Sequence, residues 1–84
     1  MFAERFLARM VTLRADLIEL RRDLLITREN IDLRFAAPGR YDDALQLDAY
    51  TRRLYKAIGS LSAAIGDAER KRAAQDSLDR RKPA

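Results

Sequence analysis

"DLIELRRDLLITRE", residues 16–29, decides the fold of this chain. Leucine and isoleucine recur there at steps of three and four, so a helix over this stretch has one apolar side. Arg14, Arg21 and Arg28 follow one another every seven residues and lie between two apolar rows. So broad an apolar side predicts two neighbouring helices, because one helix covers only a narrow stripe. The arginine stems can lie against apolar neighbours while the guanidinium groups reach a carboxylate or solvent.

The pattern extends outward from this stretch and predicts a long helix over residues 2–34. A first row alternates steps of four and three and holds one polar residue: Phe6, Met10, Leu13, Leu17, Leu20, Leu24, Thr27 and Ile31. A second row lies about 100° round the helix: Leu7, Val11, Ile18 and Leu25. We expect the first row to form the core or interface, and the second row to be the partner or dimer face.

The segment Ala37-Pro38-Gly39 interrupts the pattern. Pro38 disfavours helical geometry at Ala37, and Gly39 permits a turn. Asp42 or Asp43 is expected to cap a second helix over residues 43–80. Its predicted core row contains one extra step of four: Leu47, Tyr50, Leu54, Ile58, Leu61, Ile65 and Ala68. A connection this short predicts an all-α fold, an antiparallel two-helix hairpin.

The chain has 84 residues, which is near the lower limit for one stable core. We expect residues 1–70 to form the hairpin and residues 71–84 to form a basic, fraying C-terminal tail. A hairpin alone leaves the second row of the first helix uncovered. We therefore predict a homodimeric four-helix bundle, or a helical protein partner in place of the second copy.

Small residues line one edge of the second helix at Gly59, Ser62 and Gly66. Glycine inside a helix costs about 1 kcal/mol relative to alanine, so two of them suggest a specific reason. Close packing by another helix is the favoured explanation. A kink at Gly59–Ser60 and a ligand groove are the alternatives.

Histidine and cysteine are both absent from the chain. The commonest general base, the thiol nucleophile and the usual transition-metal ligands are therefore missing, and we expect no enzymatic activity, no metal and no cofactor. "LRADLIELRRDLL", residues 13–25, resembles the opening helix of the helical chorismate mutases. The later basic and acidic active-site positions of that family have no counterparts in the rest of the chain.

The net charge of +4 makes nucleic acid a candidate partner. From Glu69 to the end there are six Lys or Arg residues and three acids, which accounts for +3 of the +4. The candidate contacts are Arg52, Arg53, Lys56, Arg70, Lys71, Arg72, Arg80, Arg81 and Lys82. In architecture, a dimerising antiparallel hairpin is similar to the RNA-binding plasmid regulator Rop, and this is the alternative function.

The main functional expectation is a protein-protein interaction module, such as a small dimeric adaptor, an assembly subunit or a chaperone-like hairpin. The longest uncharged run, residues 57–66, is far shorter than the roughly 20 apolar residues of a membrane span. Charged residues also interrupt the first ten residues, so no signal peptide is expected. We therefore expect a cytoplasmic protein. The 14 Arg against 3 Lys indicate a GC-rich bacterial genome.

Overall fold

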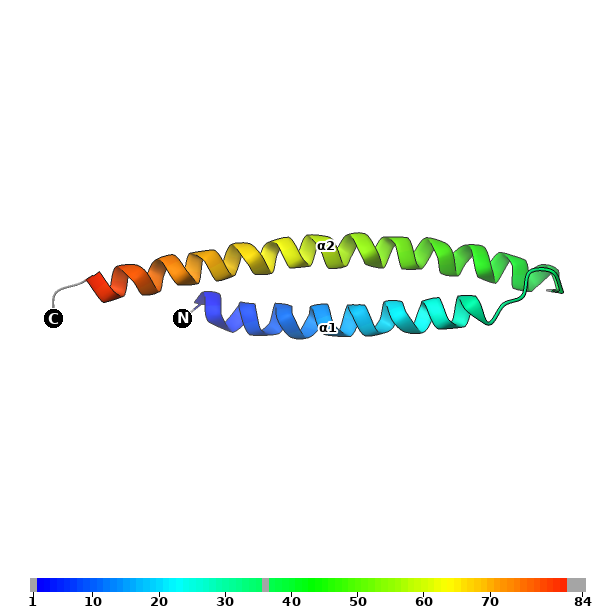
Figure 1. Ribbon diagram of the computed structural model, residues 1–84, viewed down its shortest axis with the longest axis horizontal. Coiled ribbons are helices and arrows are strands. Elements are labelled where there is room, and N and C mark those ends of the chain that lie inside the picture. The colour runs from blue at the N-terminus through cyan, green and yellow to red at the C-terminus, as the bar shows by residue number, and fades with distance from the viewer. Residues whose placement is uncertain (1, 36, 82–84) are drawn as a thin grey trace.

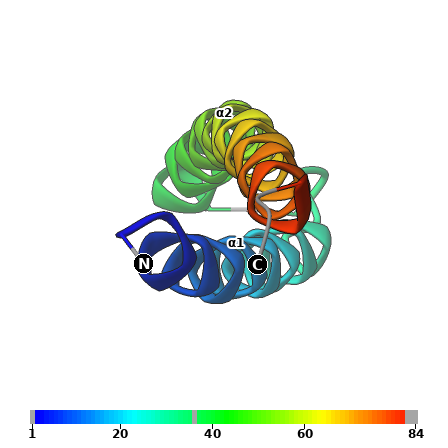
Figure 2. The same ribbon diagram turned by 90° about the vertical axis from the view of Figure 1, so that its left-hand side faces the viewer.

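The structure, a computed structural model that describes residues 2–35 and 37–81, is a hairpin of two long helices. These are α1 (Phe2–Glu29) and α2 (Pro38–Arg81), and the described residues form no strand. The helices run side by side in opposite directions (Figures 1 and 2), as a rod measuring 72 × 15 × 15 Å. The predicted all-α antiparallel hairpin is confirmed. Dimerisation stays a prediction.

The first helix ends at Glu29, five residues earlier than the predicted Arg34. The backbone N–H of Asn30 still donates to the Ile26 carbonyl at 3.2 Å, and the helical pattern then stops. Asp32 competes for the backbone, because its Oδ1 accepts the N–H of Arg34 at 3.0 Å in a local turn. The sequence pattern extends the helix into this turn because Ile31 continues the first apolar row.

The second helix begins at Pro38, five residues earlier than predicted. The Ala37 carbonyl accepts the N–H of Arg40 at 2.9 Å and that of Tyr41 at 3.3 Å, so Ala37 is the N-terminal cap. Proline suits the first helical position, where its missing N–H would have no partner anyway. The expectation that Asp42 or Asp43 caps the helix is therefore wrong, since the first turn contains no acid.

One narrow seam holds the two helices together. Its residues alternate steps of three and four, as in a coiled coil, and each is buried or half-buried. On the α1 side they are Leu7, Met10, Arg14, Leu17, Arg21, Leu24 and Arg28, with Ile31 just beyond the end of the helix. In α2 they are Ala44, Leu47, Thr51, Leu54, Ile58, Leu61, Ile65 and Ala68. The seam is thin, because only Leu7, Ala44 and Ile65 among the described apolar residues are buried.

Three polar contacts across the seam give the register of the helices. Arg28 pairs with Asp48, Arg21 lies over Tyr55, and Arg72 pairs with Glu4. The residue numbers in these pairs (28 and 48, 21 and 55, 4 and 72) each add to 76. A residue of α1 therefore lies level with the residue of α2 whose number, added to its own, gives 76.

The seam includes Arg14, Arg21 and Arg28, which the sequence pattern placed between two apolar rows. In the first predicted row, Met10, Leu17, Leu24 and Ile31 lie in the seam, whereas Phe6, Leu13 and Leu20 are 43%, 50% and 47% exposed. In α2, Tyr50 lies outside the seam and is 46% exposed, while Thr51 is buried in its place. With Thr51 in the row, the extra step of four disappears.

The second helix extends well past the first (Figure 1). At the observed register, residue 74 lies level with Phe2, so residues 75–81 have no part of α1 beside them. Every described side chain from Glu69 to Arg80 is exposed. α2 is one continuous helix through Gly59 and Ser60, and in Figure 1 its axis curves gently without a sharp kink.

Candidate functional site

One flank of the seam is polar. Arg28 Nε donates to Asp48 Oδ1 at 3.1 Å, and both side chains are partly buried. The Arg21 guanidinium carbon lies 5.2 Å from the centre of the Tyr55 ring. Asp48 and Tyr55 are seven residues apart in α2, so the arginines of the seam emerge toward one row of polar residues. We call this side the polar flank.

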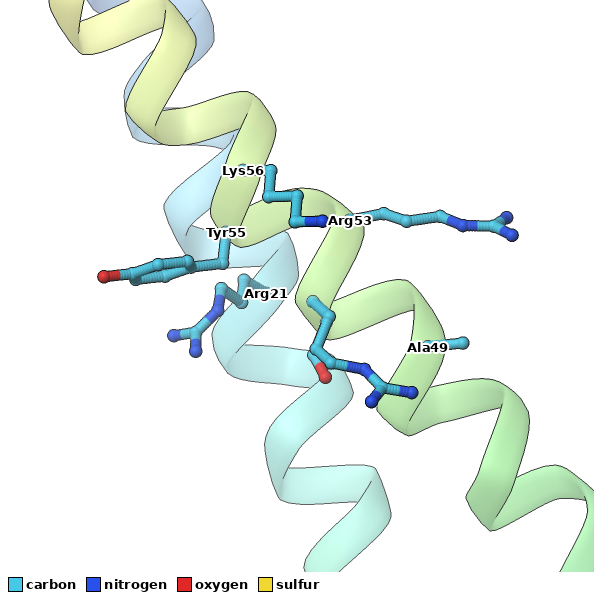
Figure 3. A pocket seen from close by; sticks show the side chains of 7 residues that line it. Arg21, Ala49, Arg53, Tyr55 and Lys56 are labelled. Atoms are coloured by element: carbon cyan, nitrogen blue, oxygen red, sulfur yellow. The ribbon is translucent and has the colours of Figure 1, made fainter.

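Arg21 is the one seam arginine with an unsatisfied buried atom. Its Nε has no hydrogen-bond partner among the described residues. The Arg21 side chain lies beside the Tyr55 ring (Figure 3), and the ring face attracts the cation. Arginine at this position therefore carries a desolvation cost that its ring contact offsets only in part.

The other flank of the seam is apolar. On this side lie the residues directly before Leu7, Arg14, Arg21 and Arg28 in α1, and directly before Ala44, Thr51, Ile58 and Ile65 in α2. Because the helices are antiparallel, these two rows adjoin. The rows contain no charge from Phe6 to Thr27 in α1, about six turns, or from Tyr50 to Ala64 in α2, about four turns. They form what we call the apolar flank, made up of Phe6, Leu13, Leu20, Tyr50, Ala57 and Ala64, all of them exposed.

The second predicted row lies on the polar flank, except for its first member. Leu7 belongs to the seam and is 8% exposed. Val11 and Ile18 are 40% and 50% exposed, and Leu25 is half-buried. Their role as a face for another chain stays a prediction, and the apolar flank on the other side of the seam is the alternative candidate for that face.

The small residues of α2 do not mediate the contact between the two helices. A Cβ added at Gly59 would meet no atom within 4 Å. At Gly66 the nearest atom would be Nη1 of Arg70, at an ordinary contact distance of 3.5 Å. Ser62 is half-buried and belongs to the polar flank. Close packing by a helix of another chain at these residues stays a prediction.

The predicted nucleic-acid contacts divide into paired and unpaired cations. Asp67 pairs with Arg70 at 3.8 Å and with Lys71 at 3.2 Å, and Glu4 pairs with Arg72 at 3.3 Å. Arg80 is exposed, Arg81 is the last residue of α2, and Lys82 lies outside the described residues. Arg80 has no carboxylate partner among the described residues, and the other unpaired cations lie together in the middle of α2.

Arg52, Arg53 and Lys56 form a basic band across the exposed side of α2. Within residues 2–35 and 37–81, no carboxylate lies within 4.0 Å of any of the three. Together with Arg21 and Tyr55 they line a shallow hollow of about 570 Å³. Figure 3 shows Arg53 extending away from both helices, so the band is an open surface and not an enclosed pocket.

Two other kinds of feature, a metal site and a membrane-spanning helix, bear on function in the part of the chain that the structure describes. No group of three or more His, Cys, Asp or Glu residues there could hold a metal ion. Neither α1 nor α2, over the described residues, offers a segment long and apolar enough to cross a membrane.

Comparison with known proteins found no matching family model, no matching curated protein and no matching solved structure.

Proposed function

We propose that this chain is a non-enzymatic protein-protein interaction module that packs its apolar flank against helices of another chain. The observation that carries the proposal is the exposure of this flank: Leu13, Leu20 and Tyr50 are 46–50% exposed on a surface without a central charge. Such surfaces are depleted in charge because a partner helix must desolvate them.

The thin seam supports the same proposal. Among the described residues no large side chain is fully buried, and three of the eight seam positions from Leu7 to Ile31 are arginines. A single core of this size contributes at best about 3–5 kcal/mol of net stability. Packing a second set of helices on the apolar flank would bury the leucines that the hairpin leaves exposed, and an adaptor or assembly subunit of this kind would be most stable in its complex.

Site-specific photo-cross-linking in cells that produce the protein tests the proposal. A photoreactive amino acid replaces Leu13 on the apolar flank or, as a matched control, Ile18 on the polar flank, since both residues are 50% exposed on the same helix. We expect protein adducts from position 13 and few from position 18. Equal adducts at both positions, or none at position 13, would contradict the proposal.

A second candidate function is nucleic-acid binding of the Rop-like kind, favoured by the unpaired basic band. Replacing Arg52 and Arg53 by glutamine removes two adjacent unpaired cations, and replacing Arg70 and Lys71 removes two adjacent cations paired with Asp67. Both variants have the same net charge. If the band binds phosphates, only the first should lose affinity and show a weaker dependence on salt. Equal behaviour of the two variants would rule the band out.

A further inference from the structure

The row that α2 contributes to the apolar flank is complementary to itself. At steps of seven it reads Asp43, Tyr50, Ala57, Ala64 and Lys71. An exposed acid stands at one end and an exposed base at the other, each fourteen residues from Ala57. The ring of Tyr50 and the methyl group of Ala64 lie seven residues from Ala57, one on each side of it.

From this row we infer that the occupant of the apolar flank is a second copy of the chain, with the two α2 helices antiparallel and crossing at Ala57. This inference rests on the proposed function of the flank. Asp43 then lies opposite Lys71 of the second copy, which also pairs with Asp67 of its own helix at 3.2 Å, and Tyr50 lies opposite Ala64 of that copy. Opposite charges meet, and each ring faces a small side chain that leaves room for it.

The first helix agrees with the same two-fold axis. At the observed register, Ala57 lies level with residue 19 of α1, which adjoins Leu20. An axis that passes between two copies at Ala57 therefore also brings Leu20 close to Leu20 of the second copy. Leu13 then lies near Thr27 of that copy, so Leu13 and Leu20 both gain a neighbour in α1 of the second copy.

The unequal lengths of the helices favour this arrangement over its main alternative. With the α2 helices paired about Ala57, the part of each α2 beyond Arg72 lies along the turn of the other copy. These overhanging parts then stand at opposite ends of the bundle, each beside the second copy. Stacking α1 of one copy on α2 of the other would put both overhanging parts at one end, where neither has a helix of the second copy stacked on it.

The side of the hairpin that carries the apolar flank is large enough for a stable dimer. From Asp43 to Lys71 this side is about 42 Å long at 1.5 Å per residue, and two helices side by side are about 20 Å wide. That gives a footprint of about 800 Å² on each copy, comparable with the roughly 800 Å² that each partner contributes to a standard specific interface.

Disulfide trapping of the purified protein tests the inference. Because the chain has no native cysteine, every disulfide must come from an introduced residue. A disulfide needs Cα atoms within about 7 Å of each other. Ala57→Cys should oxidise to a covalent dimer on its own. Tyr50→Cys and Ala64→Cys should each remain uncross-linked alone and should cross-link when mixed. Ile18→Cys, on the polar flank, is the control and should not cross-link.

The outcomes separate this inference from the proposed function. A dimer by light scattering that traps through Ala57→Cys supports both. A dimer that traps only in a mixture of Leu20→Cys with Ala57→Cys overturns the antiparallel pairing of α2 but leaves the flank as an interface. A monomer over a tenfold concentration range overturns the second copy as occupant. Photo-cross-links from position 13 to a different protein would then still support the apolar flank as a binding site for another chain.

Discussion

Replacing Arg21 by leucine should stabilise the protein, although it removes a charge and a ring contact. Arg21 lies in the seam, and its Nε is buried without a hydrogen-bond partner among the described residues. An unsatisfied buried donor costs about 1–3 kcal/mol. The contact of its guanidinium with the partly exposed Tyr55 ring, at 5.2 Å, returns about 0.5–1 kcal/mol. Leucine keeps the apolar stem and removes the orphaned donor, so the free energy of unfolding should rise by about 1 kcal/mol.

Urea unfolding followed by far-UV circular dichroism measures this change. The variants are compared at one fixed protein concentration, because self-association adds to apparent stability. A gain of about 1 kcal/mol corresponds to a melting temperature about 4–8 °C higher for a domain of this size. Arg22→Leu is the matched control, since Arg22 is exposed on the outer side of α1 and its replacement should change stability by less than about 0.5 kcal/mol.

The reasoning would be refuted if Arg21→Leu unfolded at lower urea than the unmodified protein. That result would mean that the polar contacts of Arg21 stabilise the seam by more than its desolvation costs. A gain in Arg22→Leu as large as that in Arg21→Leu would also contradict it, because the effect would then come from charge or helix propensity and not from the seam.

Three further predictions concern single positions. Ile65→Ala should cost about 2–5 kcal/mol, because Ile65 is only 2% exposed, whereas Leu45→Ala should cost far less in the same urea titration. Gly59→Ala should gain about 1 kcal/mol of helix stability, since its added Cβ meets nothing within 4 Å, and a loss would show that another chain packs there. The Arg34 side chain, and then the Arg34 N–H, hold the pKa of Asp32 below its ordinary value, so its contribution to stability is present above the pKa of the unfolded chain and is lost as pH falls through the folded pKa. NMR titration should give a higher pKa for Asp32 in Arg34→Ala, and an unchanged value would show that the side-chain hydrogen bonds from Arg34 do not form in solution.

Helix periodicity and the turn at Pro38 were enough to predict the hairpin. The ends of the helices were less predictable, because they depend on local hydrogen bonds. Asp32 draws a backbone N–H into a turn, and Ala37 caps a helix that starts with proline. Neither preference is visible in an apolar pattern, and Ile31 continues that pattern past the end of α1.

The position of the seam was harder to predict, because polar residues occupy it. Polarity argues against Arg14 and Thr51 as core residues, yet an arginine stem packs like a hydrocarbon and a threonine hydroxyl can bond within its own helix. Thr51 Oγ1 donates to the Asp48 carbonyl at 3.0 Å. The sequence did contain one signal. A row through Ala44, Leu47, Thr51, Leu54 and Ile58 alternates steps of three and four, whereas the same row with Tyr50 in place of Thr51 has two consecutive steps of four.

The order of contacts along the seam has a consequence for how the chain folds. The pair Arg28–Asp48 closes a loop of 20 residues, whereas Glu4–Arg72, separated by 68 residues (72 minus 4), closes the whole hairpin. Loop-closure entropy makes the longer loop more costly by about 1 kcal/mol. The helices should therefore join first beside the turn and zip toward the open end. The last contacts to form are also the first to open, so the two termini separate before the turn does.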